Sequence, residues 1–382
     1  MGMMQNNAPG RVCKWDNLKC FLIMTVVIGH FVNQYAGVSD LMKSLSVFIY
    51  SFHMPLFIFL SGLLERKWNE EHPFRWSKPV YYIMIGYTLK FLIYGIKILF
   101  HQKAVFHWFG DTGIPWYMFA MAALMVLTYL LRNLDPRLVF PGSIVLACLA
   151  GYDVKIGSFL YLSRIIVFFP FYYLGYHLNA QKVQKSLEKP FIKLLACVEI
   201  GTIFWVSFGK IDEIYSYIRL LTGRNAYALI NIENCGFVHR LGFYLVAFLM
   251  GAAIISLIPD RKMELPGKMG QRTLQIYFWH RLVLYVLMFS GSMDLLIKTF
   301  SQSWEWIYLA LSCILPVLLM PKVFSRPLLM LNDLEKTVEI RCARMKEKLR
   351  GRLAGSVPVV PALELLAILV MLMYYGGSFD IL

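Results

Sequence analysis

Ten long apolar runs, separated by short polar linkers, set the strongest limit on what this chain can fold into. A helix needs about 20 mostly apolar residues to cross the roughly 30 Å hydrocarbon core of a bilayer. The runs that reach or approach this length are 18–36, 45–64, 79–100, 114–131, 138–150, 159–178, 191–208, 236–258, 273–290 and 304–321. We therefore predict an all-α, polytopic bundle of about ten transmembrane helices, with an eleventh if the run 357–375 also crosses.

The composition excludes several other classes of protein. The chain is 58% apolar and 16% charged, whereas soluble domains have roughly 45–50% apolar and about 25% charged residues. This balance argues against a cytosolic enzyme, a disordered chain and a small disulfide scaffold. The seven cysteines form no CxxC pair and no metal-ligand spacing, and we interpret them as small buried hydrophobic residues.

The distribution of Lys and Arg predicts the orientation, because cytoplasmic linkers carry the excess of positive charge. Of the 38 basic residues, 24 lie in alternate segments and 7 in the intervening linkers. The basic-rich segments are 1–17, 65–78, 132–137, 179–190, 259–272 and 322–356. We therefore expect a cytoplasmic N-terminus and a multi-pass protein of the inner or plasma membrane. The net charge of +15 is dispersed over these linkers, so we expect no nucleic-acid partner.

Four segments follow from this pattern. We expect a cytoplasmic N-terminal segment at 1–17, a transmembrane domain at 18–325, a basic amphipathic cytoplasmic helix at 326–356 and a C-terminal apolar segment at 357–382. Within 333–353, apolar residues recur at helical spacing opposite a strongly basic face. This pattern is typical of a helix lying on an anionic leaflet. A calmodulin-like or nucleic-acid target is the less favoured alternative.

The first predicted span carries unusual polar residues. An ionisable group inside a bilayer costs about 2.5–3.5 kcal/mol even on insertion scales, so each one suggests a functional site. Lys19 and His30 are eleven residues apart, which is three helical turns and places them on one face. Asp16 lies one turn before Lys19, close enough to pair with it. Gly29, beside His30, allows close approach of another backbone or a substrate.

The second span returns toward the first and brings another histidine to the same level. At 1.5 Å per residue, His30 lies roughly 12 Å below the outer surface, and so does His53. Pro55 removes a backbone hydrogen bond near His53 and is expected to kink the helix. Four other residues fall in the outer half of their spans: Trp116, Tyr117, Arg164 and Arg240.

Histidine is the usual general base for activating a hydroxyl. The sequence has no HExxH, CxxC, P-loop or GxGxxG string, so zinc hydrolysis, nucleotide hydrolysis and dinucleotide chemistry lack support. His101 and His107 share an outer linker in which Asp111 is the single carboxylate residue, too few ligands for a typical metal site. We therefore expect no metal.

Several segments resemble a known family. WDNLKCFLIMTVVIGHF in the first span and IYSFHMPLFIFLSG in the second are similar to the acyltransferase 3 family of integral membrane acyltransferases, in its fucose 4-O-acetylase-like, NolL-type branch. IPWYMFAM, SRIIVFFPFYYLGYHL and IYFWH fit the same family more weakly. The resemblance covers residues 11 to about 325.

This resemblance implies a membrane O-acetyltransferase that moves an acetyl (acyl) group from cytoplasmic acetyl-CoA to a hydroxyl of a cell-surface carbohydrate or glycolipid. Lys19 and His30 match the family's pair of a basic residue and an essential histidine, although many members have Arg at the first position. His30 is then a general base or a transient acyl carrier, and Asp16 orients Lys19. The expected acceptor-binding residues are His53, Trp116, Tyr117, Arg164, Arg240 and His280. Basic residues of an inner linker, where CoA phosphates are expected to bind, are Arg66, Lys67, Arg75 and Lys78.

Two other functions fit the same architecture. A transporter or exporter of a glycan or acyl group would line a path with these polar residues and change no covalent bond. Transporters often carry inverted repeats, but GH and FHMPLF of the first two spans have no counterpart in later spans. The second is a scaffolding protein. A scaffolding role gives no reason to keep six ionisable residues inside the bilayer: Lys19, His30, His53, Lys90, Arg164 and Arg240.

Overall fold

The computed structural model describes residues 13–110, 113–157, 159–334 and 336. These residues form helices, turns and loops, with no strand among them. Of the predicted basic helix at 326–356, residues 326–334 are described and helical, and all of the rest except Lys336 lies outside the described residues, as does the whole candidate eleventh span. The fold is therefore all-α over the part of the chain that the structure describes.

Each of the ten predicted runs coincides with a helix or with a broken pair of helices. The first four are α1 (Cys13–Tyr35), the pair α2 (Asp40–Tyr50) and α3 (His53–Leu63), α4 (Ser77–Leu99) and α5 (Trp116–Leu130). The others are α6 (Pro136–Ala150), α7 (Leu162–His177), α9 (Pro190–Gly209), α12 (Gly236–Leu257), α14 (Thr273–Phe289) and α16 (Trp304–Leu318). Short helices connect them: α8 (Ala180–Leu187), α10 (Ile211–Ile214), α11 (Ile218–Leu221), α13 (Glu264–Gly270) and α15 (Ser292–Thr299).

The lengths and hydropathy of these helices make the chain a multi-pass membrane protein. Six of the described helices or continuous helix pairs are long and apolar enough to cross a bilayer, and up to eight qualify if each bent pair counts as one span. The bent pairs are α14 with α15, at 67°, and α16 with the helix Lys322–Leu334, at 75°. α5 and α6 are apolar but have only 15 residues each. The number of ten spans and the cytoplasmic N-terminus stay predictions.

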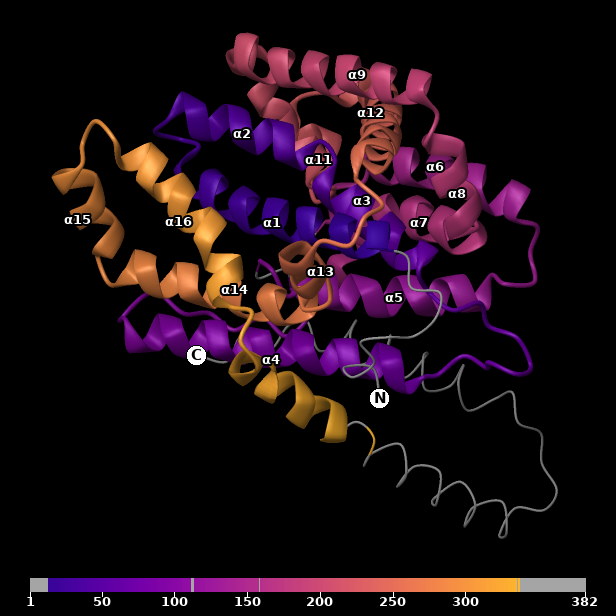
Figure 1. Cartoon of the computed structure of the whole chain (residues 1–382), viewed down its shortest axis with the longest axis horizontal. Helices are drawn as coiled ribbons and strands as arrows, with labels where there is room; N and C mark the ends of the chain where they lie inside the picture. Colours follow the sequence, from indigo (N-terminus) through magenta and orange to yellow (C-terminus); the bar gives the residue numbers. More distant parts are fainter. Residues whose placement is uncertain (1–12, 111–112, 158, 335, 337–382) are drawn as a thin grey trace.

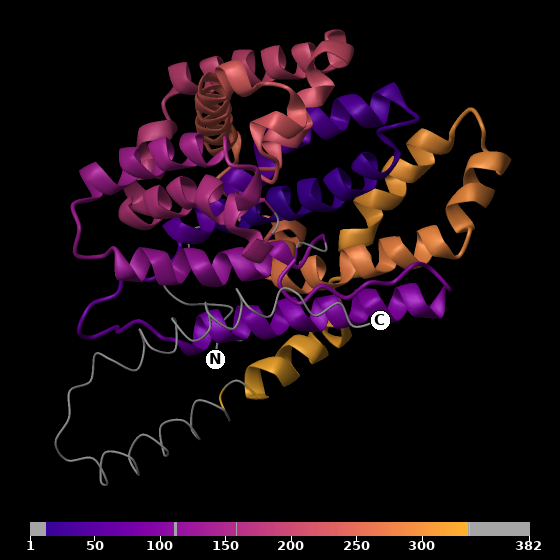
Figure 2. The ribbon, with the colours of Figure 1, turned by 180° about the vertical axis from the view of Figure 1, so that it is seen from behind.

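α1 lies at the centre of the bundle, which positions its polar residues for a site. It packs against α2, α3, α13, α14 and α16. Figures 1 and 2 show α1 between α2 on one side and α14 on the other, with α4 and α5 running alongside. A residue on α1 is therefore within reach of helices from both ends of the chain.

The second predicted span is interrupted rather than continuous. α2 ends at Tyr50, and α3 begins at His53 after a turn. Pro55 lies in the first turn of α3, where the N–H that proline lacks has no partner within the helix. The predicted irregularity near His53 is present as this break. As a result, Tyr50 and His53 flank a corner of the chain.

α3 and α7 touch backbone to backbone through two glycines. A Cβ atom built on Gly62 of α3 lies 2.2 Å from the carbonyl oxygen of Tyr172, and one built on Gly175 of α7 lies 2.2 Å from that of Phe59. The two contacts are reciprocal, so each helix places a glycine against the main chain of the other. Small residues permit this close packing between membrane helices. The contact fixes α3 to α7.

The linker between α4 and α5 folds back along α4. The ammonium group of Lys90, a residue 3% exposed on α4, donates hydrogen bonds to the carbonyl oxygens of His107, Trp108 and Gly110 at 2.8, 2.9 and 3.1 Å. Non-helical backbone at membrane depth requires such internal partners. Lys90 therefore holds this linker against the bundle.

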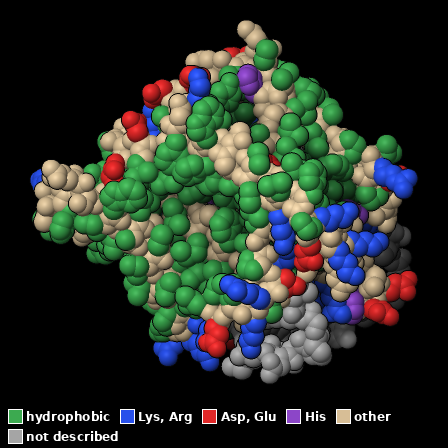
Figure 3. Space-filling view, turned by 45° about the horizontal axis from the view of Figure 1, so that its top comes forward, with side chains coloured by type: hydrophobic (Ala, Val, Ile, Leu, Met, Phe, Trp, Pro, Cys, Tyr) green, Lys and Arg blue, Asp and Glu red, His purple; other side chains and the backbone are tan. Residues whose placement is uncertain are grey.

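Basic side chains are concentrated at one end of the bundle. In Figure 3, Lys and Arg side chains gather toward the right, while hydrophobic side chains cover most of the middle of this face. The right-hand end in Figure 1 is where α1 and α4 begin and where α8 lies. We call this end the basic face. It is the end that the charge distribution predicts to be cytoplasmic.

Candidate active site

Two histidines from opposite ends of the chain stack on each other in the bundle. The ring of His30 on α1 lies 5.3 Å from the ring of His280 on α14, measured between centroids, at an interplanar angle of 29°. The Nδ1 of His280 is 2.7 Å from the carbonyl oxygen of Tyr277. A carbonyl only accepts hydrogen bonds, so we assign the ring proton to Nδ1 and a lone pair to Nε2. The Nε2 atom is buried and has no hydrogen-bond partner among the described residues.

His53 joins this pair from the corner between α2 and α3. It is 3% exposed, and its Nδ1 donates to the carbonyl oxygen of Ile49 at 2.8 Å. The ring of Tyr50 meets the ring of His53 edge-on, with centroids 4.7 Å apart. A Cβ atom on Gly29 would lie 3.1 Å from the Ile49 side chain. α1 and α2 therefore approach closely at the level where the sequence places a glycine.

Two arginines supply positive charge to the same region. Arg281 donates from its guanidinium to the carbonyl oxygen of His30 at 3.3 Å. The guanidinium of Arg164 lies 4.5 Å from the ring centroid of Trp116. Both arginines interact electrostatically with His30. Both also act on Tyr50. We call the set His30, Tyr50, His53, Arg164, His280 and Arg281 the histidine cluster.

A small pocket lies between the histidine cluster and the basic face. It has a volume of about 150 Å³ and is lined by Lys19, Ser61, Tyr82, Tyr117 and Tyr277, among others. The hydroxyl groups of Ser61 and Tyr117 are 3.2 Å apart. The ring of Tyr277 lies 5.3 Å from that of Tyr117 and 5.6 Å from that of His280, between centroids. We call it the tyrosine pocket, and Tyr277 separates it from the histidines.

Lys19 and Asp16 lie where the sequence places them relative to each other. The ammonium of Lys19 is 3.8 Å from a carboxylate oxygen of Asp16. Lys19 lines the tyrosine pocket, whereas His30 belongs to the cluster on the far side of Tyr277. Lys19 and His30 therefore lie on opposite sides of Tyr277 and do not touch.

A larger pocket, with several charged residues in its lining, opens at the basic face. It has a volume of about 490 Å³, and Arg66, Arg75 and Lys78 contribute to its lining. Lys78 pairs with Glu65 and Arg66 with His72 inside it. We call it the basic pocket.

Lys67 lies beside the basic pocket and does not line it. Its ammonium sits 4.1 Å from the ring centroid of Tyr176. Three of the four basic residues predicted in this linker therefore face one space, and the fourth flanks it.

The remaining predicted residues are divided between different places. Trp116 stacks on Arg164 in the histidine cluster, but its neighbour Tyr117 faces the tyrosine pocket. Arg240 does not join the cluster: it is 0% exposed, donates to the carbonyl oxygen of Leu220 at 2.9 Å and lies over aromatic rings. These contacts tie α12 to α11, which is a structural arrangement.

Four residues of the histidine cluster and the tyrosine pocket were not assigned from the sequence: Tyr50, Tyr82, Tyr277 and Arg281. Tyr277 precedes His280 by three positions, about one helical turn, and Arg281 is adjacent to His280. Tyr50 precedes His53 by three positions across the break between α2 and α3. That spacing is a usable signal. The described residues contain no group of three His, Cys, Asp or Glu side chains arranged to hold a metal ion.

Comparisons with known proteins place the chain in a family. No curated protein and no solved structure matches it. A family described as "Acyltransferase domain", the acyltransferase 3 family, matches residues 14–321, a span that contains both the histidine cluster and the two pockets. Because the match covers well over half of its 382 residues, the protein belongs to the acyltransferase 3 family and is a membrane acyltransferase.

Proposed function

We propose that the protein transfers an acetyl group from acetyl-CoA, bound at the basic face, to a hydroxyl of a carbohydrate that enters from the opposite side. The observation that carries this proposal is the stacked His30–His280 pair, which lies next to two arginines and is separated from the tyrosine pocket only by Tyr277. Membership of the acyltransferase 3 family establishes acyl transfer as the class of reaction. The geometry supports the surroundings of the His30–His280 pair as the place where donor and acceptor meet.

The step we propose is direct transfer with His30 as general base. The His30 ring removes the proton from the acceptor hydroxyl while that oxygen attacks the thioester carbonyl carbon. Arg281 and Arg164 stabilise the negative charge on the carbonyl oxygen of the tetrahedral intermediate. The carbon–sulfur bond then breaks, and the CoA thiolate takes the proton from His30. In the alternative order of steps, the acetyl group is first transferred to a ring nitrogen of His30, and the acceptor hydroxyl then attacks this acetyl-histidine.

The donor side of the proposal rests on the basic pocket. Arg66 and Arg75 line one cavity of about 490 Å³, together with the Lys78–Glu65 ion pair and Glu71. Arginine suits bidentate phosphate binding. The acyl arm would then run past Lys19 and the tyrosine pocket. Lys19 and His30 are eleven residues apart on α1, which is about 16 Å along a helix.

The acceptor side rests on Trp116 and Arg164. An aromatic face and a guanidinium group 4.5 Å from its centroid offer stacking and hydrogen bonds of the kind that suit a sugar ring. Neither side chain carries a negative charge. A carbohydrate acceptor also agrees with the resemblance to fucose 4-O-acetylase-like proteins.

Alkali-labile acetate on envelope glycans tests this function. We expect a strain that lacks the protein to lose this acetate and the wild-type gene to restore it, while a vector encoding His30→Ala at matched membrane levels does not. If acetate is unchanged and export of the glycan falls instead, the protein is a transporter and the proposal is wrong.

The pH dependence of donor binding gives a separate prediction. Desolvation lowers the pKa of Lys67 to about 8. Its ammonium form therefore falls from roughly nine-tenths at pH 7 to roughly one-tenth at pH 9. If Lys67 binds a donor phosphate, KM for acetyl-CoA rises over this interval, and Lys67→Arg, which stays charged, removes the rise. An equal rise in the variant would show that Lys67 does not contact the donor.

A further inference from the structure

A third cavity takes no part in the proposed reaction. It is a groove of about 540 Å³ between α3, α7, α8 and α12, within the range of about 300–1,000 Å³ that ligand sites occupy. Aromatic and aliphatic side chains form most of its wall, including Leu56, Phe59, Phe171 and Phe248. A groove with this lining suits a hydrocarbon chain and offers few partners to a sugar or a nucleotide.

One end of the groove is polar. Asn179, Lys182 and Ser186, on one face of α8 and its N-cap, line this end. The side chain of Asn179 accepts a hydrogen bond from the backbone N–H of Lys182 at 3.0 Å. The Lys182 ammonium makes no ion pair with a described carboxylate. Within the part of the chain that the structure describes, it is therefore an unpaired cation at the mouth of an apolar cavity.

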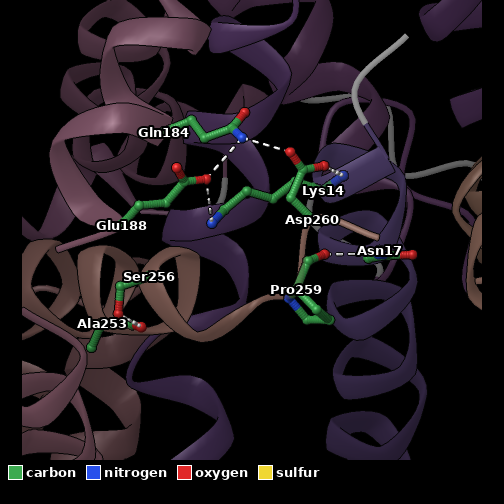
Figure 4. A network of polar contacts seen from close by, with 8 residues as sticks. All are labelled: Lys14, Asn17, Gln184, Glu188, Ala253, Ser256, Pro259 and Asp260. Carbon is green, nitrogen blue, oxygen red and sulfur yellow. Dashed lines mark hydrogen bonds and ion pairs between the residues drawn. The ribbon is translucent and has the colours of Figure 1, made fainter. Parts of the chain in front are cut away.

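The opposite face of α8 is tied down, which explains why Lys182 points toward the groove. Figure 4 shows Gln184 and Glu188 turned toward Lys14 and Asp260. The Gln184 amide donates to Asp260 at 2.7 Å and to Glu188 at 2.8 Å, and the Lys14 ammonium lies 3.8 Å from Glu188. These contacts join α8 to α1 and to the end of α12. Because Lys182 lies about half a turn from Gln184, it faces the other way.

The groove reaches from the basic face into the membrane. On α12 its lining extends from Ile255 back to Ala247, eight residues or about 12 Å along a helix. The polar end is thus at headgroup level and the apolar wall at the level of acyl chains. This order of polar and apolar surface is the order found in a membrane lipid.

We propose that this groove is a binding site for an anionic phospholipid of the leaflet at the basic face. The phosphate pairs with Lys182 and hydrogen-bonds to Ser186, and one acyl chain lies between α3 and α12. Anionic headgroups attract lysine and arginine near the surface of a leaflet. α3 begins at His53, so an acyl chain packed against α3 also helps to hold His53 in the histidine cluster. The inference does not depend on the identity of donor or acceptor.

The test uses delipidated full-length protein in detergent, with phosphatidylglycerol or phosphatidylcholine of identical chains added. Native mass spectrometry counts the bound lipid, and the apparent midpoint of thermal unfolding reports its effect. A ligand that binds only the folded state raises this midpoint. We expect phosphatidylglycerol to raise it by at least about 3 °C and phosphatidylcholine to have little effect.

Two variants and one matched control locate the site. Lys182→Gln should remove the preference for phosphatidylglycerol, and Ala252→Phe should fill the groove and abolish retention of lipid. Lys185→Gln removes the same charge from the same helix at a position outside the groove and should behave as wild type. Equal binding of both lipids, or equal losses in Lys182→Gln and Lys185→Gln, would overturn the proposal. These two comparisons remain decisive if Ala252→Phe fails to fold.

Discussion

Replacing His30 by glutamine is expected to lower kcat for acetyl transfer by about 10²–10⁴-fold, the usual contribution of a general base. Glutamine keeps the size and polarity of the side chain but does not take up a proton. KM for acetyl-CoA should change little, because the basic pocket lies on the far side of the tyrosine pocket. The measurement is steady-state transfer of labelled acetate by purified protein in proteoliposomes.

His239→Gln is the matched control for this experiment. His239 lies on α12 with its ring 5.3 Å from that of Tyr217, outside the histidine cluster, so its replacement should leave kcat within about twofold of wild type. His280→Gln identifies the partner in the stack. If that variant loses the activity and His30→Gln keeps it, His280 is the base and the assignment of His30 is wrong.

Replacing Gly175 or Gly62 by alanine is expected to prevent stable assembly of the bundle. Each new Cβ atom would lie 2.2 Å from a carbonyl oxygen of the facing helix, far inside van der Waals contact, and a main-chain atom inside a helix has little freedom to move aside. Helices α3 and α7 must therefore separate along their whole contact. We expect the free energy of unfolding to fall by more than about 4 kcal/mol, a size that single substitutions reach only when they severely disrupt the core.

Size-exclusion profiles and apparent unfolding midpoints in detergent measure this effect. Gly142→Ala and Gly201→Ala are the controls, because both glycines lie inside helices and a Cβ atom there meets nothing within 4 Å. Alanine favours a helix by up to about 1 kcal/mol over glycine, so these variants should be neutral or slightly stabilised. A Gly175→Ala protein with a midpoint within about 2 °C of wild type would contradict the reciprocal contact.

The positions of the helices could be predicted from the sequence because burial in a bilayer leaves a long apolar signal. Counting along α1 and back along the second span predicts one level for His30 and His53, and in the structure His53 lies close enough to His30 to interact with it electrostatically. Rotation about the helix axis was not accessible. Arg240 has a suitable depth, yet packing turns it toward Leu220, away from the histidines.

Contacts between segments that are distant in the chain account for the other differences between the predicted site and the site in the structure. Nothing local indicates that α14 presents His280 and Arg281 to α1, because that choice depends on how seventeen residues of one helix fit the groove of another. Similarly, Tyr277 is one of 22 tyrosines in the chain. Its spacing of one turn from His280 is a local signal, but its place between the tyrosine pocket and His280 is set by tertiary packing. The tertiary packing of the helices decides which of the candidate residues in the sequence come together in the site.

The backbone contact between α3 and α7 also divides the molecule mechanically. Helices locked through Gly62 and Gly175 neither slide nor rotate separately, so the start of α3, with His53, and the start of α7, with Arg164, move as one rigid body. The partners that face them, His30 and Arg281, belong to helices outside this lock, and α14 is followed by a 67° bend. We therefore expect any motion that opens the histidine cluster to occur on the α1–α14 side, while α3 and α7 move together.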